Sequence, residues 1–154
     1  EDNSVATGEI INLLTRRNLL FQITNAPLNA LRVNIKVGSK EYSLDEAADP
    51  STFVQKVRAQ LGDENRSLRI YGSETVIARF IGTSNKIHLH LLNYSGRNIA
   101  GLRVKLKGKF SNKNALAYGY GSEQLEDFVF VNGATEFTIP QMSNYAFVEL
   151  PRVK

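Results

Sequence analysis

The feature that most constrains the fold is the alternation of apolar and polar side chains in the stretch I-H-L-H-L-L-N-Y-S-G-R, which begins at Ile87. Successive side chains of a β-strand point to opposite faces of the sheet. Ile87, Leu89 and Leu91 are therefore expected in a core, and His88 and His90 on the other face. The residues that close the stretch are turn formers. The pattern predicts a half-buried strand followed by a turn.

A second alternating run follows directly. Its apolar residues are Leu102, Val104, Leu106 and Phe110, and its opposite face carries Arg103, Lys105, Lys107 and Lys109. Two alternating runs joined by a loop rich in glycine and asparagine are typical of an antiparallel pair with one dry and one wet face. We therefore expect these two strands to be neighbours in one sheet.

The rest of the C-terminal half also has the pattern of β-structure. Further strands are expected at residues 115–120, 126–131, 135–139 and 145–150. The Asn132-Gly133 pair is a strong hairpin signal, and Pro140 is expected to end the strand before it. Turns at this spacing are typical of a sandwich, so residues 85–154 are predicted to form an antiparallel, immunoglobulin-like β-sandwich.

The N-terminal half mixes helical and strand patterns. A weak helical pattern covers residues 4–17, and strands are expected at 19–24, 31–37, 68–71 and 76–81. The best helix spans residues 50–61. Asp49 is a preferred capping residue, Pro50 suits the first helical position, and Gly62 suits the left-handed position after the last turn.

This second helix has one apolar stripe, formed by Phe53, Val57 and Leu61, which should lie on a sheet. The fold class is therefore predicted as α+β: a small α/β subdomain over residues 1–84 in which a helix covers a sheet, followed by the sandwich of residues 85–154. No linker rich in proline, glycine or serine separates the halves, so we expect them to pack as one unit.

Composition excludes several classes of protein. Of the 154 residues, 42% are hydrophobic, which is typical of a globular chain. No apolar run is long enough for a membrane span, and the absence of cysteine excludes disulfides and thiol catalysis. The formal charge of +4 is mild, so nucleic-acid binding is not expected. The first residues, Glu1 to Ser4, fit either a mature chain without its signal peptide or a shortened piece.

His88 and His90 form an H-x-H pair, which is a weak metal signal. A zinc site would need at least one more protein ligand, whereas the neighbouring strand is expected to present Lys105 and Lys107, which would repel a divalent cation. We therefore expect no metal and no cofactor. The acidic residues outside the strands fit solvation and capping, and no nucleophile or phosphate-binding motif is present.

The best candidates for ligand binding are aromatic. Tyr118 and Tyr120 lie two residues apart, so a strand would place both rings on one face, about 7 Å apart. Lys109 and Lys113 lie near them in the sequence and would favour an acidic polysaccharide. Tyr94 and Tyr145 are further candidates. The competing interpretation is that these rings cover strand ends and the contact between the two halves.

Two segments carry a resemblance to a known group of proteins. The pairing of H-L-H-L-L-N-Y-S-G-R with G-L-R-V-K-L-K-G, and the later A-T-E-F-T-I-P-Q-M-S-N-Y-A-F-V-E-L, resemble the start and end of the small β-sandwich at the C-terminus of many bacterial glycoside-hydrolase-like proteins. The similarity covers roughly the last 70 residues, 85–154. The resemblance implies a domain that packs against an enzymatic or amidotransferase-like domain and carries no catalytic residue.

We therefore expect a non-catalytic, secreted or periplasmic accessory module that binds a glycan, another protein or another domain. One alternative is a hydrolase-type enzyme with an unrecognised site near His88 and His90, which carboxylates gathered around the histidines would favour. The other is a basic nucleic-acid-binding module, which a continuous lysine face with exposed aromatic residues would favour.

Overall fold

The computed structural model describes residues 4–26, 28–29, 50–113, 116–119, 121–122 and 124–153. The chain divides into two compact units, Glu1–Arg66 and Ser67–Lys154. The division falls earlier than the expected boundary between residues 84 and 85, because the strands at 68–71 and 76–82 pair with strands of the second half. The expectation that the halves pack as one unit stays a prediction.

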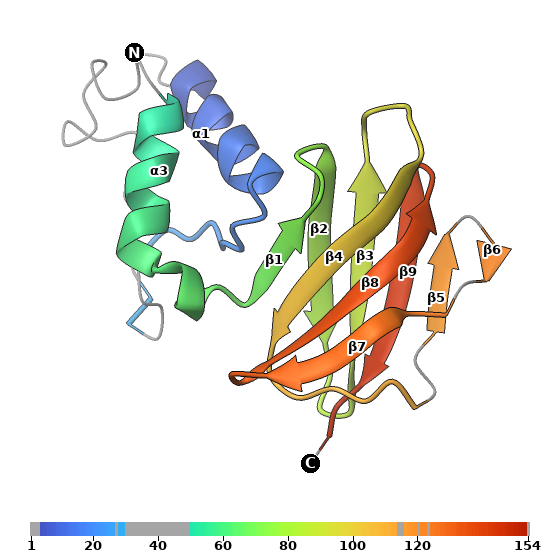
Figure 1. Ribbon diagram of the computed structural model, residues 1–154. Helices are drawn as coiled ribbons and strands as arrows, with labels where there is room; N and C mark the ends of the chain where they lie inside the picture. Colours follow the sequence, from blue (N-terminus) through green and yellow to red (C-terminus); the bar gives the residue numbers. More distant parts are fainter. Residues whose placement is uncertain are drawn as a thin grey trace. The chain divides into compact units, whose positions relative to one another are not determined.

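The described part of the first unit consists of helices α1 (Ser4–Arg16) and α3 (Pro50–Leu61) and the short 3-10 helix η1 (Asp63–Asn65) (Figure 1). The two long helices share one apolar cluster, made of Ile10, Leu14, Leu19, Phe53, Val54 and Val57. The predicted stripe of α3 is thus buried at Phe53 and Val57 and partly buried at Leu61, against α1. Gly62 ends α3 with a φ of 74°, as expected.

One strand prediction in this unit is wrong, because residues 19–24 are irregular. Asn18 adopts a left-handed conformation with a φ of 54°, and the Leu19 N–H donates to the Leu14 carbonyl, so the chain turns back at the end of α1. Leu19 then packs into the helical cluster instead of pairing in a sheet. Asp49 and the predicted strand at 31–37 lie outside the described residues.

The second unit contains two antiparallel sheets. The four-stranded sheet has the order β1 (Leu68–Tyr71), β4 (Ile99–Lys107), β8 (Ala134–Met142) and β7 (Glu126–Val131). The five-stranded sheet has the order β2 (Val76–Gly82), β3 (Lys86–Asn93), β9 (Tyr145–Pro151), β5 (Leu116–Gly119) and β6 (Gly121–Ser122). Figure 1 shows β4 and β8 as a layer in front of β3 and β9. Their inner faces share one core, which is the arrangement of a sandwich.

The strand order does not confirm the immunoglobulin-like part of the prediction. In an immunoglobulin domain the first two strands of the chain pair with each other. Here β1 pairs with β4, and β2 pairs with β3. Within the described residues, the structure shows a coarser architecture: two α-helices followed by two antiparallel sheets with a common core.

The predicted pairing of β3 with β4 is wrong. β3 pairs with β2 and β9, whereas β4 pairs with β1 and β8 in the other sheet. Each strand has one fully apolar face, and placing the two in opposite layers buries both faces in one core. The connection between them is fixed by Asn93, whose buried side chain donates to the carbonyls of Arg97 and Ser143 and accepts from Ser95.

The remaining strand predictions of this unit are confirmed with small shifts. The hairpin of β7 and β8 turns at Asn132 and Gly133, which have φ values of 51° and 75°. Pro140 does not end its strand, because β8 continues to Met142. Pairing skips Pro140, which has no N–H to donate, and resumes on either side of it. In the described residues, no helix is long and apolar enough to cross a membrane.

Candidate functional site

The outer side of the five-stranded sheet carries basic, acidic and aromatic side chains close to one another. The apolar residues of β3 and β9 point into the core, so the alternate residues lie on the outer side. Backbone pairing places His88 opposite Glu149 and His90 opposite Phe147. We call this surface the histidine face and define it by Lys86, His88, His90, Tyr145, Phe147 and Glu149.

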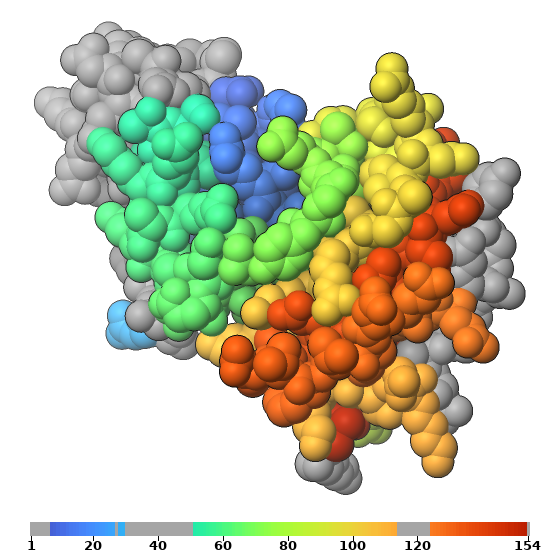
Figure 2. Space-filling view, in the orientation of Figure 1, coloured from blue at the N-terminus to red at the C-terminus, as the bar shows by residue number. Residues whose placement is uncertain are grey.

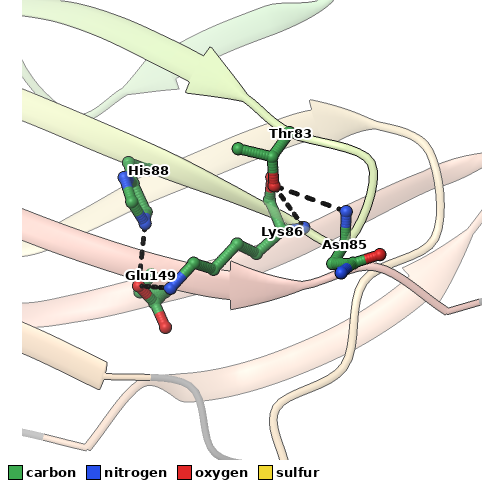
Figure 3. Close-up of polar contacts among 5 residues, drawn as sticks. All are labelled: Thr83, Asn85, Lys86, His88 and Glu149. Atoms are coloured by element: carbon green, nitrogen blue, oxygen red, sulfur yellow. Dashed lines mark hydrogen bonds and ion pairs between the residues drawn. The ribbon is translucent and has the colours of Figure 1, made fainter.

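Glu149 is the polar centre of the histidine face. One of its oxygens, Oε2, accepts hydrogen bonds from Lys86 Nζ and from His88 Nε2, each at 2.7 Å (Figure 3). The hydrogen bond from Lys86, followed by that from His88, lowers the pKa of this carboxyl below its ordinary value. Glu149 is therefore a carboxylate, and thus an acceptor, at neutral pH.

Lys86 is positioned by the turn between β2 and β3. The Thr83 hydroxyl oxygen accepts from the backbone N–H groups of Asn85 and Lys86 at 3.3 and 3.2 Å (Figure 3). The Thr83 N–H also donates to the Lys86 carbonyl. These bonds close a short turn and begin β3 at Lys86, so its side chain falls on the same face as His88.

Phe147 is the aromatic centre of the histidine face. Its ring centroid lies 5.4 Å from that of His88 and 5.1 Å from that of His90. His90 Nδ1 lies 2.7 Å from the Tyr145 hydroxyl, and their ring centroids are 6.2 Å apart. Four rings thus form a continuous strip, and its outermost member, Tyr145, has 47% of its surface exposed.

The strip of rings has a neighbouring strand on each side. Arg79 of β2 is the partner of His90, and Tyr118 of β5 is the partner of Phe147. The structure therefore brings the backbone of Tyr118 beside the histidine face. The Tyr118 side chain and all of Tyr120 lie outside the described part of the chain. The proposed role of both tyrosines in binding stays a prediction.

The other two predicted ligand residues lie elsewhere. Lys109 is exposed, and its Nζ lies 5.7 Å from the ring centroid of Phe130, on β7 of the four-stranded sheet. Lys113 is exposed in the turn that follows, where its N–H donates to the Ser111 hydroxyl. Neither has a contact with the histidine face among the described residues. Tyr94 lies in the loop after β3, where its hydroxyl donates to the Glu74 carbonyl.

The two histidines lie beside β9, and not beside the lysine-bearing β4 that the sequence predicted. Lys105 belongs to the other sheet, and the strand beside β3 contributes a carboxylate, Glu149. His88 and His90 turn to different partners, Glu149 and Tyr145. Within the described residues, no group of three or more histidine and acidic side chains could hold a metal ion. The expectation of no metal stays a prediction.

The outer side of the four-stranded sheet carries an ion-pair network instead. Glu136 Oε1 binds Lys105 Nζ at 3.0 Å, and Glu136 Oε2 binds Arg103 at 3.3 Å. Arg103 also approaches Asp127 at 3.8 Å. The hydrogen bond from Lys105 holds the pKa of Glu136 below its ordinary value. Figure 2 shows this side of the second unit, where the orange strands β7 and β8 reach the surface.

Comparison with known proteins finds a likeness of fold only. No family model matches the chain, and no curated protein matches it either. Among solved structures, the chain is similar to alpha-L-fucosidase isoenzyme 2 from Paenibacillus thiaminolyticus, with a TM-score of 0.54 and 17% sequence identity. The match covers 71% of this chain and 19% of the fucosidase chain. The chain thus resembles in fold about a fifth of a glycoside hydrolase, which agrees in part with the resemblance noted in the sequence.

Proposed function

We propose that this chain is a non-catalytic accessory module that binds glycans through the histidine face. The observation that carries the proposal is the strip of rings around Phe147, bordered by the Glu149 carboxylate, on the outer side of the five-stranded sheet. The fold likeness to part of a fucosidase supports it, because it relates this architecture to a sugar-processing chain.

The chemistry of the histidine face suits a sugar. A pyranose ring has an apolar face of C–H groups, which packs on aromatic rings, and a rim of hydroxyl groups, which needs hydrogen-bond partners. Phe147 and Tyr145 supply the aromatic rings, and Glu149 and His88 supply the hydrogen-bond partners. The outer side of a sheet suits the side of a glycan chain better than a buried small molecule, which needs a concave pocket.

A catalytic role has less support. Hydrolysis by paired acids needs two carboxyl groups about 5–10 Å apart across one cleft, one of them protonated. Glu149 is held as a carboxylate by Lys86 and His88. The described residues gather no further acidic side chain into a group with the two histidines.

Nucleic-acid binding also has less support. Two of the cations on the outer side of the four-stranded sheet, Arg103 and Lys105, are paired with Glu136. On the histidine face, Lys86 is paired with Glu149. Phosphate backbones are bound by cations that release counterions, so cations already neutralised by carboxylates contribute little.

The resemblance to secreted glycoside-hydrolase-like proteins leads us to propose a secreted or periplasmic location and an immunoglobulin-like class for the sandwich. Fractionation of the producing cells, with an antibody to this chain, tests the location. Recovery of the chain in the cytoplasmic fraction alone would remove this part of the proposal.

The binding proposal is tested with immobilised polysaccharides and two matched variants. Phe147→Ala removes the centre of the aromatic strip, and Phe130→Ala removes an exposed phenylalanine from the other sheet. We expect wild type and Phe130→Ala to be retained equally by at least one glycan, and Phe147→Ala to lose at least about tenfold in affinity. Equal retention of all three proteins, or of none, contradicts the proposal. Thermal melts confirm that the variants are folded.

A further inference from the structure

The two carboxylate oxygens of Glu149 differ in the hydrogen bonds that they accept. Oε2 accepts from both Lys86 and His88. Oε1 receives no hydrogen bond from any described residue, and Figure 3 shows it directed away from both donors. The side chain as a whole is 22% exposed. A carboxylate oxygen is an acceptor only.

The same contact fixes the position of one proton of His88. A carboxylate has no proton to donate, so the proton of the 2.7 Å bond lies on His88 Nε2. The other nitrogen, Nδ1, has no hydrogen-bond partner among the described residues, and 32% of the side chain is exposed. Glu149 Oε1, which is an acceptor, and His88 Nδ1 thus form a polar pair next to each other on the sheet.

The charges of Lys86 and Glu149 compensate each other beside this polar pair, because the two side chains are bound at 2.7 Å. The backbone partner of His88 on the other side is Ile81, which is apolar and 64% exposed. Arg79 lies in the next row, opposite His90, and is separated from Glu149 by β3. An anionic group placed at Glu149 Oε1 would therefore meet a carboxylate first.

We propose that the polar pair of Glu149 Oε1 and His88 Nδ1 binds neighbouring hydroxyl groups of a neutral sugar, and that the histidine face discriminates against carboxylated and sulfated glycans. This inference rests on the proposed function and names its ligand class. One hydroxyl group donates to Oε1, and a neighbouring one, which can donate or accept, bonds to Nδ1, while the sugar's apolar face packs on Phe147. It replaces the acidic polysaccharide that Lys109 and Lys113 would favour, because neither lysine has a contact with this face among the described residues: Lys109 approaches Phe130, and the Lys113 N–H donates to Ser111.

The test compares neutral polysaccharides, such as mannan, xylan and galactan, with carboxylated ones, such as polygalacturonate and alginate. Wild type should bind a neutral glycan at least about tenfold more tightly than any carboxylated one, at neutral pH and moderate salt. This comparison requires no variant, so no folding defect can obscure it. Tighter binding of a carboxylated glycan overturns the inference.

Two variants of nearly unchanged shape test whether Glu149 causes the preference for neutral glycans. In Glu149→Gln, the amide oxygen turns to Lys86 and His88, and the amide N–H₂ replaces Oε1 at the surface, so an acceptor becomes a donor. Affinity for the neutral glycan should fall about tenfold or more. The control is Glu136→Gln, which removes a lysine-bound carboxylate from the other sheet and should leave affinity unchanged.

The outcomes separate the inference from the function it rests on. If Phe147→Ala loses binding but Glu149→Gln equals wild type on the neutral glycan, the face binds glycans and the polar pair does not determine its specificity. If Glu149→Gln binds a carboxylated glycan more tightly than wild type binds a neutral one, the proposed ligand class is wrong. If wild type binds no glycan, the proposed function itself fails.

Discussion

The outer sides of the two sheets contain nearly the same ionic group, a glutamate bound by a lysine from the neighbouring strand. On the four-stranded sheet both oxygens of Glu136 are occupied, by Lys105 and by Arg103. On the five-stranded sheet both donors bind one oxygen of Glu149, and the second oxygen faces outward. The first group is complete and fits a role in stability. The second has capacity left for a ligand.

The neighbours of the two groups differ in the same way. Glu136 is surrounded by Arg103, Lys105 and, through Arg103, Asp127, so its environment is ionic. Glu149 lies beside the rings of His88 and Phe147. A carboxylate next to exposed rings offers a ligand both apolar and polar contacts, whereas an ion-pair network offers mainly charge that is already compensated. This comparison predicts that substitutions on the two sheets will affect different properties.

The largest effect on stability is expected at the connection that both sheets share. Asn93→Ala should cost about 2–4 kcal/mol in the free energy of unfolding, because it leaves the carbonyls of Arg97 and Ser143 without their donor. Urea denaturation measures the loss. A loss below about 0.5 kcal/mol would show that water replaces these bonds and that the loop does not depend on Asn93.

A smaller effect on the free energy of unfolding should distinguish Glu136 from Glu149. Glu136→Gln should lower the free energy of unfolding by about 1 kcal/mol, because it weakens two partly buried ion pairs at once. Glu149→Gln should change stability less and glycan affinity more. Denaturation of both variants in parallel measures the difference. The reverse order of stability effects would remove the distinction between a structural and a binding carboxylate.

The smallest effect is in the pH dependence of stability. The pKa of Glu136 is lower in the folded chain than its ordinary value of 4.5, so its contribution is present above that value and is lost as the pH falls through the folded pKa. Thermal melts between about pH 5 and pH 3 should therefore show a shallower loss of stability for Glu136→Gln than for wild type. Parallel curves would contradict the lowered pKa.

The sequence predicted which side chains are buried better than it predicted which strands are neighbours. The alternation in β3 and β9 correctly placed Ile87, Leu89 and Val148 inside, because the period of two depends on local backbone geometry alone. The choice of partner strand depends on how the whole core closes. A short loop between two alternating runs favoured a hairpin, whereas burial of two apolar faces against each other put β3 and β4 in opposite sheets.

The candidate site was predictable in its parts and not in its assembly. The two histidines were visible as an H-x-H pair, and the stretch Y-A-F-V-E-L already places Tyr145, Phe147 and Glu149 on one face of a strand. His88 and Glu149 are 61 residues apart, and nothing local in either stretch indicates that β9 lies beside β3. Only the pairing of β9 with β3 brings the outward-facing residues of the two strands together as one surface.

The most direct test of the account is a titration of the isotope-labelled chain with a neutral oligosaccharide, followed by backbone amide shifts in NMR spectra. The account predicts that the largest shifts cluster at residues 86–90 of β3 and 145–149 of β9. Residues 103–107 of β4 and 134–138 of β8 should be unaffected and serve as the internal reference. Shifts centred on the second pair of strands, or no saturable shift with any neutral oligosaccharide, would contradict the assignment of the histidine face as the binding surface.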